Sequence, residues 1–327
     1  MKKNCKIGII GCGGIARAHI KGYAENKDVE LIAFCDIKEE NAERYARELK
    51  GRAYSDYRIM LQKEELDGVS VCTPPVNHKE ITEYTLSKGA NVFCEKPLAM
   101  NSKEALSMVE TAKANKRLLM TGFKFRFRDE VQNAKRLINE GKIGKVVLAR
   151  NMFGGFAEMK ERFFSRKNIS GGGVLIDNGS HAIDLFRFLL GEVKNVSARI
   201  NSAIQKIEVE DTAKILMEME NGVLVTIDLS WSVSVPSDYY LEIYGSEGTI
   251  TLPPLRYKRK GDAGWTEHKV QSEDIFAKET AHFVDCILGK RKPIVDGLDG
   301  LRTQEVMDSA YKSCRENCWV EVKRAKV

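Results

Sequence analysis

Residues 6–16 read KIGIIGCGGIA, and this stretch decides the fold of the first part of the chain. The apolar run up to Gly11 predicts a strand, and the stretch Gly14–Glu25 predicts a helix. The turn between them fits G-x-G-x-x-A. Gly11 permits a tight turn, Gly13 lets the backbone approach a pyrophosphate, and Ala16 lets the helix pack closely on the strand. We therefore predict a dinucleotide site with its phosphates at the helix N-terminus; a glycine turn that serves packing alone is the alternative.

The strand–helix alternation that begins here continues to about residue 122. Strands that alternate with helices form a parallel sheet covered on both faces, and such strands are continuous apolar runs. Further strands are expected at Val29–Cys35, Gly68–Thr73, Asn91–Cys94 and Leu118–Thr121, and further helices at Glu39–Lys50, Lys79–Lys88 and Ser102–Asn115.

Beyond Gly122 the pattern changes to strands that follow one another, which form a mostly antiparallel sheet. Asn221-Gly222 predicts a two-residue hairpin turn. We predict an α/β Rossmann-like domain over residues 1–122 and an α+β domain with a large, mostly antiparallel sheet over residues 123–327. The second domain's strands are expected at Lys145–Met152, Val193–Ala203, Thr212–Met219, Val223–Trp231, Tyr239–Tyr244 and Thr249–Leu252, and its helices at Glu130–Glu140, His181–Leu190, Glu273–Leu288 and Gly300–Asn317.

Length and composition set limits on the class of protein. A chain of 327 residues is too long for one core and suits two domains. No apolar run is long enough to cross a bilayer and the first residues lack a signal-peptide core, so we expect a cytoplasmic protein without a membrane partner. A net charge of +6 without a basic module predicts no nucleic-acid partner. The eight cysteines lack metal-ligand spacing, which predicts reduced, buried thiols and no metal site.

The type of dinucleotide is indicated by Asp36, which ends the second predicted strand twenty residues after Ala16. A carboxylate at this place binds the ribose hydroxyls of the adenosine and repels a 2′-phosphate, which favours NAD over NADP. Lys38 follows closely and weakens that preference. The alternative for Asp36 is a cap on the helix that follows.

Six further motifs occur in a fixed order along the chain. Residues 73–78 read TPPVNH, 95–97 EKP, 122–127 GFKFRF, 171–184 GGGVLIDNGSHAID, 210–213 EDTA and 244–249 YGSEGT. In these motifs the chain resembles the glucose–fructose oxidoreductase / inositol dehydrogenase / MocA (Gfo/Idh/MocA) family over nearly its whole length. The resemblance implies an oxidoreductase that transfers a hydride between NAD and a secondary alcohol of a sugar, cyclitol or sugar derivative.

The resemblance also implies the residues that hold the cofactor. They lie in the glycine turn, at the end of the second strand and in the TPPVNH and EKP motifs: Gly11, Gly13, Gly14, Ile15, Asp36, Thr73, Pro74, Asn77, His78, Glu95 and Lys96.

Two residues are expected to carry the chemistry. Lys96 lies just past the carboxyl end of a predicted strand, where a lysine stabilises a developing alkoxide by its charge; a solvated surface lysine is the alternative. His181 suits the acid/base role because neutral imidazole takes a hydroxyl proton near neutral pH; a capping or packing histidine is the alternative. A helix N-terminus beside His181 would also favour an alkoxide.

Neighbouring residues are expected to complete the site. Asp177 either orients the imidazole or binds a substrate hydroxyl, unless it caps the following helix. Asp184 either contacts His181 or pairs with Arg187. The expected substrate contacts are Lys96, Arg126, Asp177 and His181. Other basic residues flank the expected cleft and suit an acidic or phosphorylated sugar, or form a solvated face: Lys124, Arg128, Arg162, Arg166 and Lys167.

Two alternative functions share these features. A non-enzymatic NAD-sensing regulator keeps the fold but loses the catalytic pair, whereas Lys96 and His181 are both present. An NAD-dependent glycoside hydrolase uses the same transient oxidation and returns the hydride. The resemblance further implies a homodimer or homotetramer through the C-terminal sheet. The run Val223–Ile227, apolar on both faces, suits such an interface and equally suits a sheet covered by helices.

Overall fold

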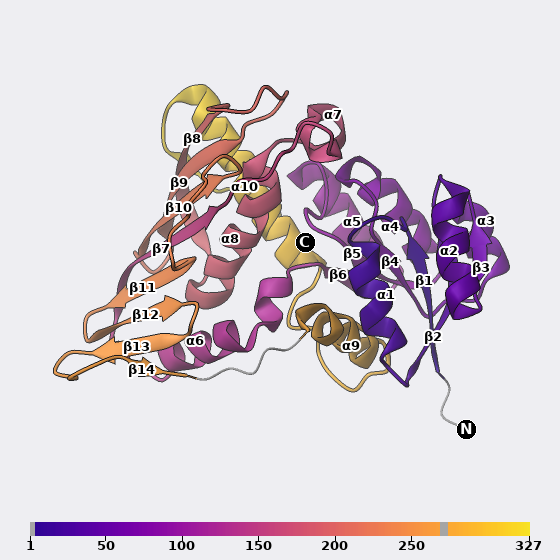
Figure 1. Ribbon diagram of the computed structural model, residues 1–327, viewed down its shortest axis with the longest axis horizontal. Helices are drawn as coiled ribbons and strands as arrows, with labels where there is room; N and C mark the ends of the chain where they lie inside the picture. Colours follow the sequence, from indigo (N-terminus) through magenta and orange to yellow (C-terminus); the bar gives the residue numbers. More distant parts are fainter. Residues whose placement is uncertain (1–3, 269–273) are drawn as a thin grey trace. The chain divides into compact units, whose positions relative to one another are not determined.

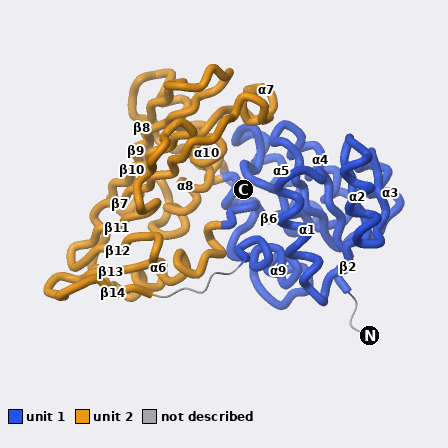
Figure 2. The backbone as a smooth tube through the Cα atoms, in the orientation of Figure 1, with its two compact units in different colours: residues 1–124, 274–301, 326–327 blue, residues 125–273, 302–325 orange. Residues whose placement is uncertain are grey.

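The computed structural model describes residues 4–268 and 274–327 (Figure 1). The chain forms two compact units (Figure 2): unit 1 consists of residues 1–124, 274–301 and 326–327, and unit 2 of residues 125–273 and 302–325. The first crossing between units follows residue 124, close to the predicted boundary after residue 122. The sequence pattern does not indicate that residues 274–301 return to unit 1, because an apolar helix face does not reveal what covers it.

Unit 1 contains the predicted parallel sheet, with six strands in the order β3-β2-β1-β4-β5-β6. The strands are β1 Cys5–Ile10, β2 Val29–Cys35, β3 Arg52–Tyr54, β4 Gly68–Val71, β5 Asn91–Cys94 and β6 Leu119–Thr121. The helices are α1 Ala16–Ala24, α2 Glu39–Leu49, α3 Tyr57–Lys63, α4 His78–Ser87, α5 Ser102–Ala114 and α9 Ile275–Ile287, with the 3₁₀ helix η1 Pro75–Asn77. The prediction missed β3 and α3, which are too short to show a period.

Helix α9 belongs to unit 1 because it packs on α1. A Cβ on Gly22 of α1 would lie 2.4 Å from Thr280 Oγ1 and 3.0 Å from Ala277 Cα of α9, so only a glycine lets the two helices approach this closely. The side chain of Asp274 caps α9 by accepting the N–H of Phe276 at 3.1 Å. Residue 273, where this helix was predicted to begin, lies outside the described residues.

Unit 2 contains a nine-stranded sheet in the order β14-β13-β12-β11-β7-β10-β9-β8-β15. Among the described strand pairs of this sheet, only β7–β10 is parallel, so the predicted, mostly antiparallel sheet is confirmed. The strands are β7 Val146–Gly154, β8 Val193–Asn201, β9 Thr212–Met219, β10 Leu224–Ser230, β11 Leu241–Gly245, β12 Gly248–Leu252, β13 Arg256–Arg259, β14 Thr266–Glu267 and β15 Val320–Glu321.

The helices of unit 2 include one that differs from the prediction. Helix α8 begins at Val174, seven residues before the predicted start at His181, and it continues through Gly179 and Ser180 although both residues disfavour a helix interior. The others are α6 Asp129–Asn139, α7 Lys167–Ser170 and most of α10 Gly297–Glu316, with the 3₁₀ helices η3 Phe163–Ser165 and η2 Lys124–Phe127, the last lying at the crossing between units.

Helix α8 covers one face of the large sheet (Figure 1). Val225, Ile227 and Leu229 of β10 are fully buried on this side, and a Cβ on Gly179 of α8 would already lie 3.1 Å from Leu229 Cδ1. On the opposite face Leu224 is 52% exposed and lies in register with Leu148 of β7, which is 44% exposed. One face of β10 is therefore covered by a helix of the same unit, and the other presents the pair Leu224 and Leu148 to the surface.

The turn at Asn221-Gly222 joins β9 and β10, as predicted, but it has three residues. Met219 N–H donates to Val223 O at 2.9 Å, which leaves Glu220, Asn221 and Gly222 in the loop. Of these three, only Gly222 has a positive φ, +83°. A two-residue turn of the primed kind needs a positive φ at its first or at both central positions.

The structure tests the expectation that the thiols are buried and the expectation that no segment crosses a membrane. Five thiols are buried, those of Cys5, Cys12, Cys35, Cys72 and Cys94, whereas Cys286 and Cys314 are half-buried and Cys318 is exposed. Burial was therefore predicted correctly for the sheet of unit 1 and wrongly for Cys318. Among the described residues, no helix has both the length and the apolar character that a bilayer crossing requires.

Candidate active site

The predicted cofactor residues of unit 1 gather at the carboxyl edge of its parallel sheet. Gly11 directly follows β1, Asp36 follows β2, Glu95 follows β5 and Gly122 follows β6, while Thr73 lies two residues beyond β4. Loops at this edge of a parallel sheet are where α/β proteins bind their ligands.

The glycine turn has the geometry of a phosphate site. Gly11 has a φ of +85°, and a Cβ there would lie 2.7 Å from the backbone carbon of Cys72, so the position admits only glycine. A Cβ on Gly13 or Gly14 would meet nothing within 4 Å. No side chain caps α1 at its N-cap residue, Ile15. An uncapped helix N-terminus above exposed glycines fits a pyrophosphate.

Asp36 links the end of β2 to the glycine turn. Its Oδ2 accepts the N–H of Cys12 at 2.8 Å and its Oδ1 accepts the N–H of Lys38 at 2.9 Å. The N-cap of α2 is Lys38, so the alternative that Asp36 caps this helix is wrong. The carboxylate is half-buried, and each oxygen keeps a lone pair that suits a ribose hydroxyl.

His78 contacts the backbone of two loops at the same edge of the sheet. Its side chain is fully buried, with Nδ1 2.8 Å from Pro97 O and Nε2 2.8 Å from Thr73 O. Burial lowers the pKa of His78 below its ordinary value. The imidazole therefore bears on the expected cofactor site through the backbone of Thr73 and Pro97. Between these turns Pro74 is the N-cap of η1 and Asn77, its last residue, is exposed.

Glu95 and Lys96 are joined to a residue that the sequence did not indicate. Glu95 is buried; its Oε1 lies 2.8 Å from His19 Nε2, and its Oε2 accepts the backbone N–H of Lys96 at 3.1 Å. Burial alone raises the pKa of Glu95, but the hydrogen bond and charge of His19, with the charges of Lys96 and Lys124, bring it below its ordinary value. His19 was missed because one polar residue in a helical pattern does not reveal its partner.

In unit 2 the two residues expected to act on substrate lie on α8. Asp177 is in the first turn, where its N–H donates to Gly173 O at 3.0 Å, and His181 follows one turn later on the same face. Gly173 is the N-cap, so the capping alternative for Asp177 is wrong. His181 is 7% exposed and its ring meets Phe125 edge-on at 5.2 Å. His181 thus lies inside the helix, and the expected N-terminal field is not beside it.

The N-terminus of α8 is bound by Glu210, from the loop before β9. Glu210 Oε1 accepts the N–H of Gly173 at 2.9 Å, the N–H of Leu175 at 3.1 Å and the hydroxyl of Tyr311 at 2.7 Å. A Cβ on Gly173 would lie 2.0 Å from Glu210 O, which explains the last glycine of the triplet. This contact fixes the turn of α8 that carries Asp177.

Asp211, the next residue, holds a different loop. Its carboxylate accepts the N–H groups of Ala203, Ile204 and Gln205 at 2.8 to 2.9 Å and the hydroxyl of Ser232 at 2.9 Å. Burial alone raises the pKa of Asp211, but these hydrogen bonds outweigh it and lower the pKa to about 2. The carboxylate therefore stays ionised and shapes the loop after β8.

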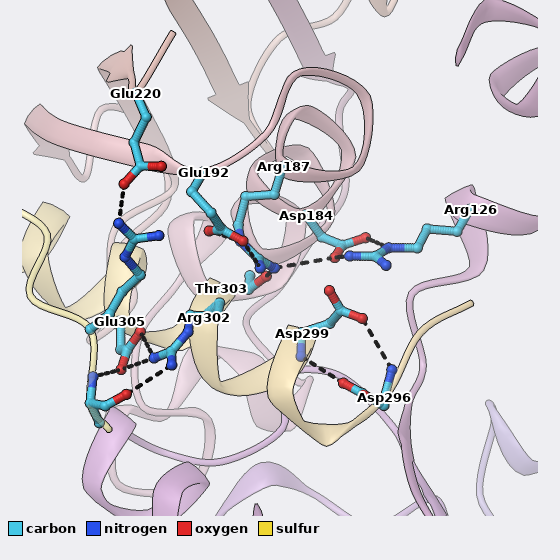
Figure 3. Close-up of polar contacts among 12 residues, drawn as sticks. Arg126, Asp184, Arg187, Glu192, Glu220, Asp296, Asp299, Arg302, Thr303 and Glu305 are labelled. Atoms are coloured by element: carbon cyan, nitrogen blue, oxygen red, sulfur yellow. Dashed lines mark hydrogen bonds and ion pairs between the residues drawn. The ribbon is translucent and has the colours of Figure 1, made fainter. Parts of the chain in front are cut away.

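Arg126 and Asp184 form a buried ion pair in unit 2 (Figure 3). Arg126 donates from Nε and Nη2 to the two Asp184 oxygens at 3.0 and 2.6 Å, and both residues are at most 4% exposed. Arg187 Nη1 lies 3.8 Å from the same carboxylate and donates to Thr303 Oγ1 at 3.1 Å. Asp184 thus pairs mainly with Arg126. This bidentate pair accounts for the burial of Arg126 through the fold, and its expected contact with substrate stays a prediction.

The other basic candidates differ in how far they are buried. Arg128 pairs with Glu130 at 3.1 Å and lies over the ring of Tyr240, whose hydroxyl also donates to Glu130. Lys124 lies over Phe276 at 5.0 Å. Arg162, Arg166 and Lys167 are exposed, as the alternative of a solvated face predicts.

Comparison with known proteins agrees with this geometry. Residues 5–123 match the oxidoreductase family with an NAD-binding Rossmann fold, and residues 131–251 match the Gfo/Idh/MocA C-terminal domain. The glucose-6-phosphate 3-dehydrogenase of Bacillus subtilis is 31% identical over 94% of this chain and 95% of its own length. The D-apiose dehydrogenase of Paraburkholderia graminis is 29% identical over 98% of this chain and 90% of its own.

A solved structure shows the same fold. An oxidoreductase from Agrobacterium radiobacter, in complex with NAD+, L-tartaric acid and magnesium, superposes with a TM-score of 0.89 at 24% identity, covering 98% of this chain and 99% of its own. The family match and the open glycine turn agree on the cofactor. The chain therefore belongs to the Gfo/Idh/MocA family of oxidoreductases and is an NAD-dependent dehydrogenase.

Proposed function

We propose that this dehydrogenase transfers a hydride between NAD and the carbon of a secondary alcohol in a sugar, cyclitol or sugar derivative. The observation that carries the proposal is His181, a 7% exposed imidazole one helical turn after Asp177 on α8. The names of the relatives, which include a glucose-6-phosphate 3-dehydrogenase and a D-apiose dehydrogenase, support the substrate class.

Each proposed residue has one task in the oxidation. Bound NAD supplies the hydride acceptor. His181 takes the hydroxyl proton as the C–H bond gives up its electron pair, so that the alcohol becomes a ketone and the imidazole an imidazolium. The ammonium group of Lys96 stabilises the negative charge that develops on the oxygen. Asp177 orients the imidazole or binds a neighbouring hydroxyl, and in the reverse direction His181 returns the proton.

The cofactor is proposed to lie along the carboxyl edge of the sheet in unit 1. The open turn at Gly13 and Gly14 receives the pyrophosphate at the N-terminus of α1, and Asp36 binds the adenosine ribose. The remaining proposed contacts come from the same edge: Gly11, Ile15, Thr73, Pro74, Asn77, His78, Glu95 and Lys96.

We also propose a homodimer or homotetramer that forms through the open face of the large sheet. Leu148 and Leu224 lie side by side there and are each at least 44% exposed. Exposed apolar neighbours on a sheet face are more often buried by a partner than left in water.

The test of the proposed reaction is NADH formation across a panel of inositols, aldoses, phosphorylated sugars and sugar acids, with NADP in parallel. Accumulation of NADH with a free polyol supports the dehydrogenase. Release of sugar from a glycoside without net NADH would support the NAD-dependent glycoside hydrolase instead. Tight NAD binding with no turnover of either kind would favour the non-enzymatic regulator.

A further inference from the structure

A chain of buried hydrogen bonds crosses unit 1 from helix α1 to the backbone of Lys96. The Tyr23 hydroxyl lies 2.8 Å from Ser70 Oγ, and Ser70 Oγ lies 3.2 Å from His19 Nδ1. His19 Nε2 lies 2.8 Å from Glu95 Oε1, and Glu95 Oε2 accepts the N–H of Lys96 at 3.1 Å. The first three side chains are at most 1% exposed, and Glu95 is 7% exposed.

The acceptor at the end of this chain fixes one donor. A carboxylate only accepts, so His19 donates from Nε2 to Glu95, while its Nδ1 faces the Ser70 hydroxyl. The Ser70 hydroxyl also meets the phenol of Tyr23. Burial raises the pKa of Tyr23 well above its ordinary value, so this phenol keeps its proton. The hydrogen bonds therefore end on the carboxylate beside Lys96.

The residue types Ser70, His19 and Glu95 are those of a nucleophilic triad, but their burial excludes that use. Ser70 and His19 have no exposed surface, and the Ser70 hydroxyl is in contact with Tyr23. A nucleophile that no substrate reaches does no chemistry. The hydrogen-bonded chain of Tyr23, Ser70, His19 and Glu95 is therefore structural, and Glu95 is the member that contacts Lys96.

The imidazole of His19 is also held in place by its neighbours. Its ring centre lies 4.5 Å from that of Phe93 and 6.4 Å from that of Phe276, with Tyr23 edge-on at 6.5 Å. These rings fix the plane of the imidazole, so Nε2 has one direction in which to donate. A buried carboxylate with a single oriented donor on one oxygen has little freedom to turn.

We propose that His19 is a positioning residue for Lys96 and acts through the carboxylate of Glu95. The proposal rests on the proposed role of Lys96 in the reaction. His19 lies on α1, the helix that starts at the glycine turn. The N-terminus of this helix is proposed to bind the cofactor phosphates. His19, one turn further along the same helix, positions the backbone of Lys96 through Glu95. A misplacement of a charged group by about 1 Å costs as much as a hundredfold in rate.

Two substitutions separate the two sides of the imidazole. The amide nitrogen of glutamine replaces Nε2, so His19→Gln keeps a donor to Glu95 and loses the contact with Ser70. The shorter His19→Asn reaches Ser70 and loses Glu95. Ser70→Ala is the matched variant that removes the far hydrogen bond and leaves His19 and Glu95 in place.

We expect His19→Asn to lower kcat about tenfold or more, with the Kd for NADH changed less than about twofold. His19→Gln should retain kcat to within about threefold of the wild type, and Ser70→Ala should lose no more than His19→Gln. NADH affinity is read by fluorescence titration, and the Tm of each variant is measured alongside. Equal kcat in His19→Asn and His19→Gln, or a kcat that follows Tm across the series, would overturn the proposal.

A measurement on the unsubstituted protein tests whether His19 donates to Glu95 from Nε2, and it does not depend on a variant that folds. Nitrogen-15 NMR of the histidine side chains should show His19 protonated on Nε2; protonation on Nδ1 alone contradicts the proposal. Lys96→Ala separates failure of the proposed function from failure of this inference. An active Lys96→Ala enzyme contradicts the proposed role of Lys96 in the reaction. An inactive Lys96→Ala enzyme, combined with equal kcat in His19→Asn and His19→Gln, contradicts only the role of His19.

Discussion

The carboxylate of Glu210 accepts the N–H of Gly173 at 2.9 Å, although 37 residues separate the two along the chain. Because the same oxygen accepts the N–H of Leu175, the first turn of α8 is anchored from outside the helix. Asp177 lies in that turn and His181 in the next. The EDTA motif is therefore a structural support for the helix expected to carry the acid/base group.

Removing this anchor should reduce stability. Glu210→Ala is expected to lower the free energy of unfolding by about 1–2 kcal/mol, the usual effect of losing a helix cap, as measured by denaturant unfolding. Glu210→Gln keeps an acceptor oxygen and should lose less than half as much. Tyr311→Phe, which removes only one of three donors, is the matched control. Equal losses in the alanine and glutamine variants would show that the hydrogen bonds to Gly173 and Leu175 contribute little.

Asp36 should set the choice of cofactor. Asp36→Ser removes the charge that repels a 2′-phosphate, so the ratio of kcat/KM for NADP to that for NAD should rise about tenfold or more. The accompanying control is Lys38→Ala, which keeps the carboxylate and should leave the enzyme at least as selective for NAD. An unchanged ratio in Asp36→Ser would assign Asp36 only to the glycine turn, through its hydrogen bond with Cys12.

The proposed chemistry predicts large losses of turnover at two positions. Lys96→Ala and His181→Ala should each lower kcat about a hundredfold or more, because one loses the charge that stabilises the alkoxide and the other the base. NADH binding, measured by fluorescence, should be nearly intact in both. The exposed Lys113→Ala on α5 is the control for loss of a lysine. Turnover like that of the wild type in either variant removes that residue from the mechanism.

Asp211 should make stability depend on pH in acid. Its pKa is lowered from 3.8 to about 2 in the folded protein, so the ionised form stabilises the fold above the unfolded pKa. This contribution is complete above about pH 4 and is lost as the pH falls toward about 2. The stability difference between the wild type and Asp211→Asn, measured by denaturant unfolding, should be constant at neutral pH and shrink in that window. A difference that does not change with pH contradicts the assignment.

The open sheet face should govern assembly. Leu224→Glu places a charge beside Leu148 on the open sheet face, and it is expected to dissociate the proposed oligomer. Size-exclusion chromatography with light scattering measures the mass directly. Ile59→Glu on α3 of unit 1, where the side chain is 45% exposed, is the matched control and should not change the mass. A wild-type monomer would remove the proposal altogether.

The sequence alone determined those features that depend on neighbours along the chain. The parallel sheet followed from the strand–helix alternation, and the phosphate turn followed from the glycines of residues 11–14, because apolar period and backbone freedom are local properties. The family followed from the order of the motifs, which the match to residues 5–123 and 131–251 confirms.

The tertiary structure decided everything that depends on a partner far along the chain. Only the folded chain shows that α9 returns to unit 1, that Arg126 is held by Asp184, and that His19 meets Glu95. These contacts join residues 58 or more positions apart, and no local pattern encodes which buried polar group will face another. A buried charge or imidazole must find a partner, but its identity is set by packing, which the sequence specifies only through the whole fold.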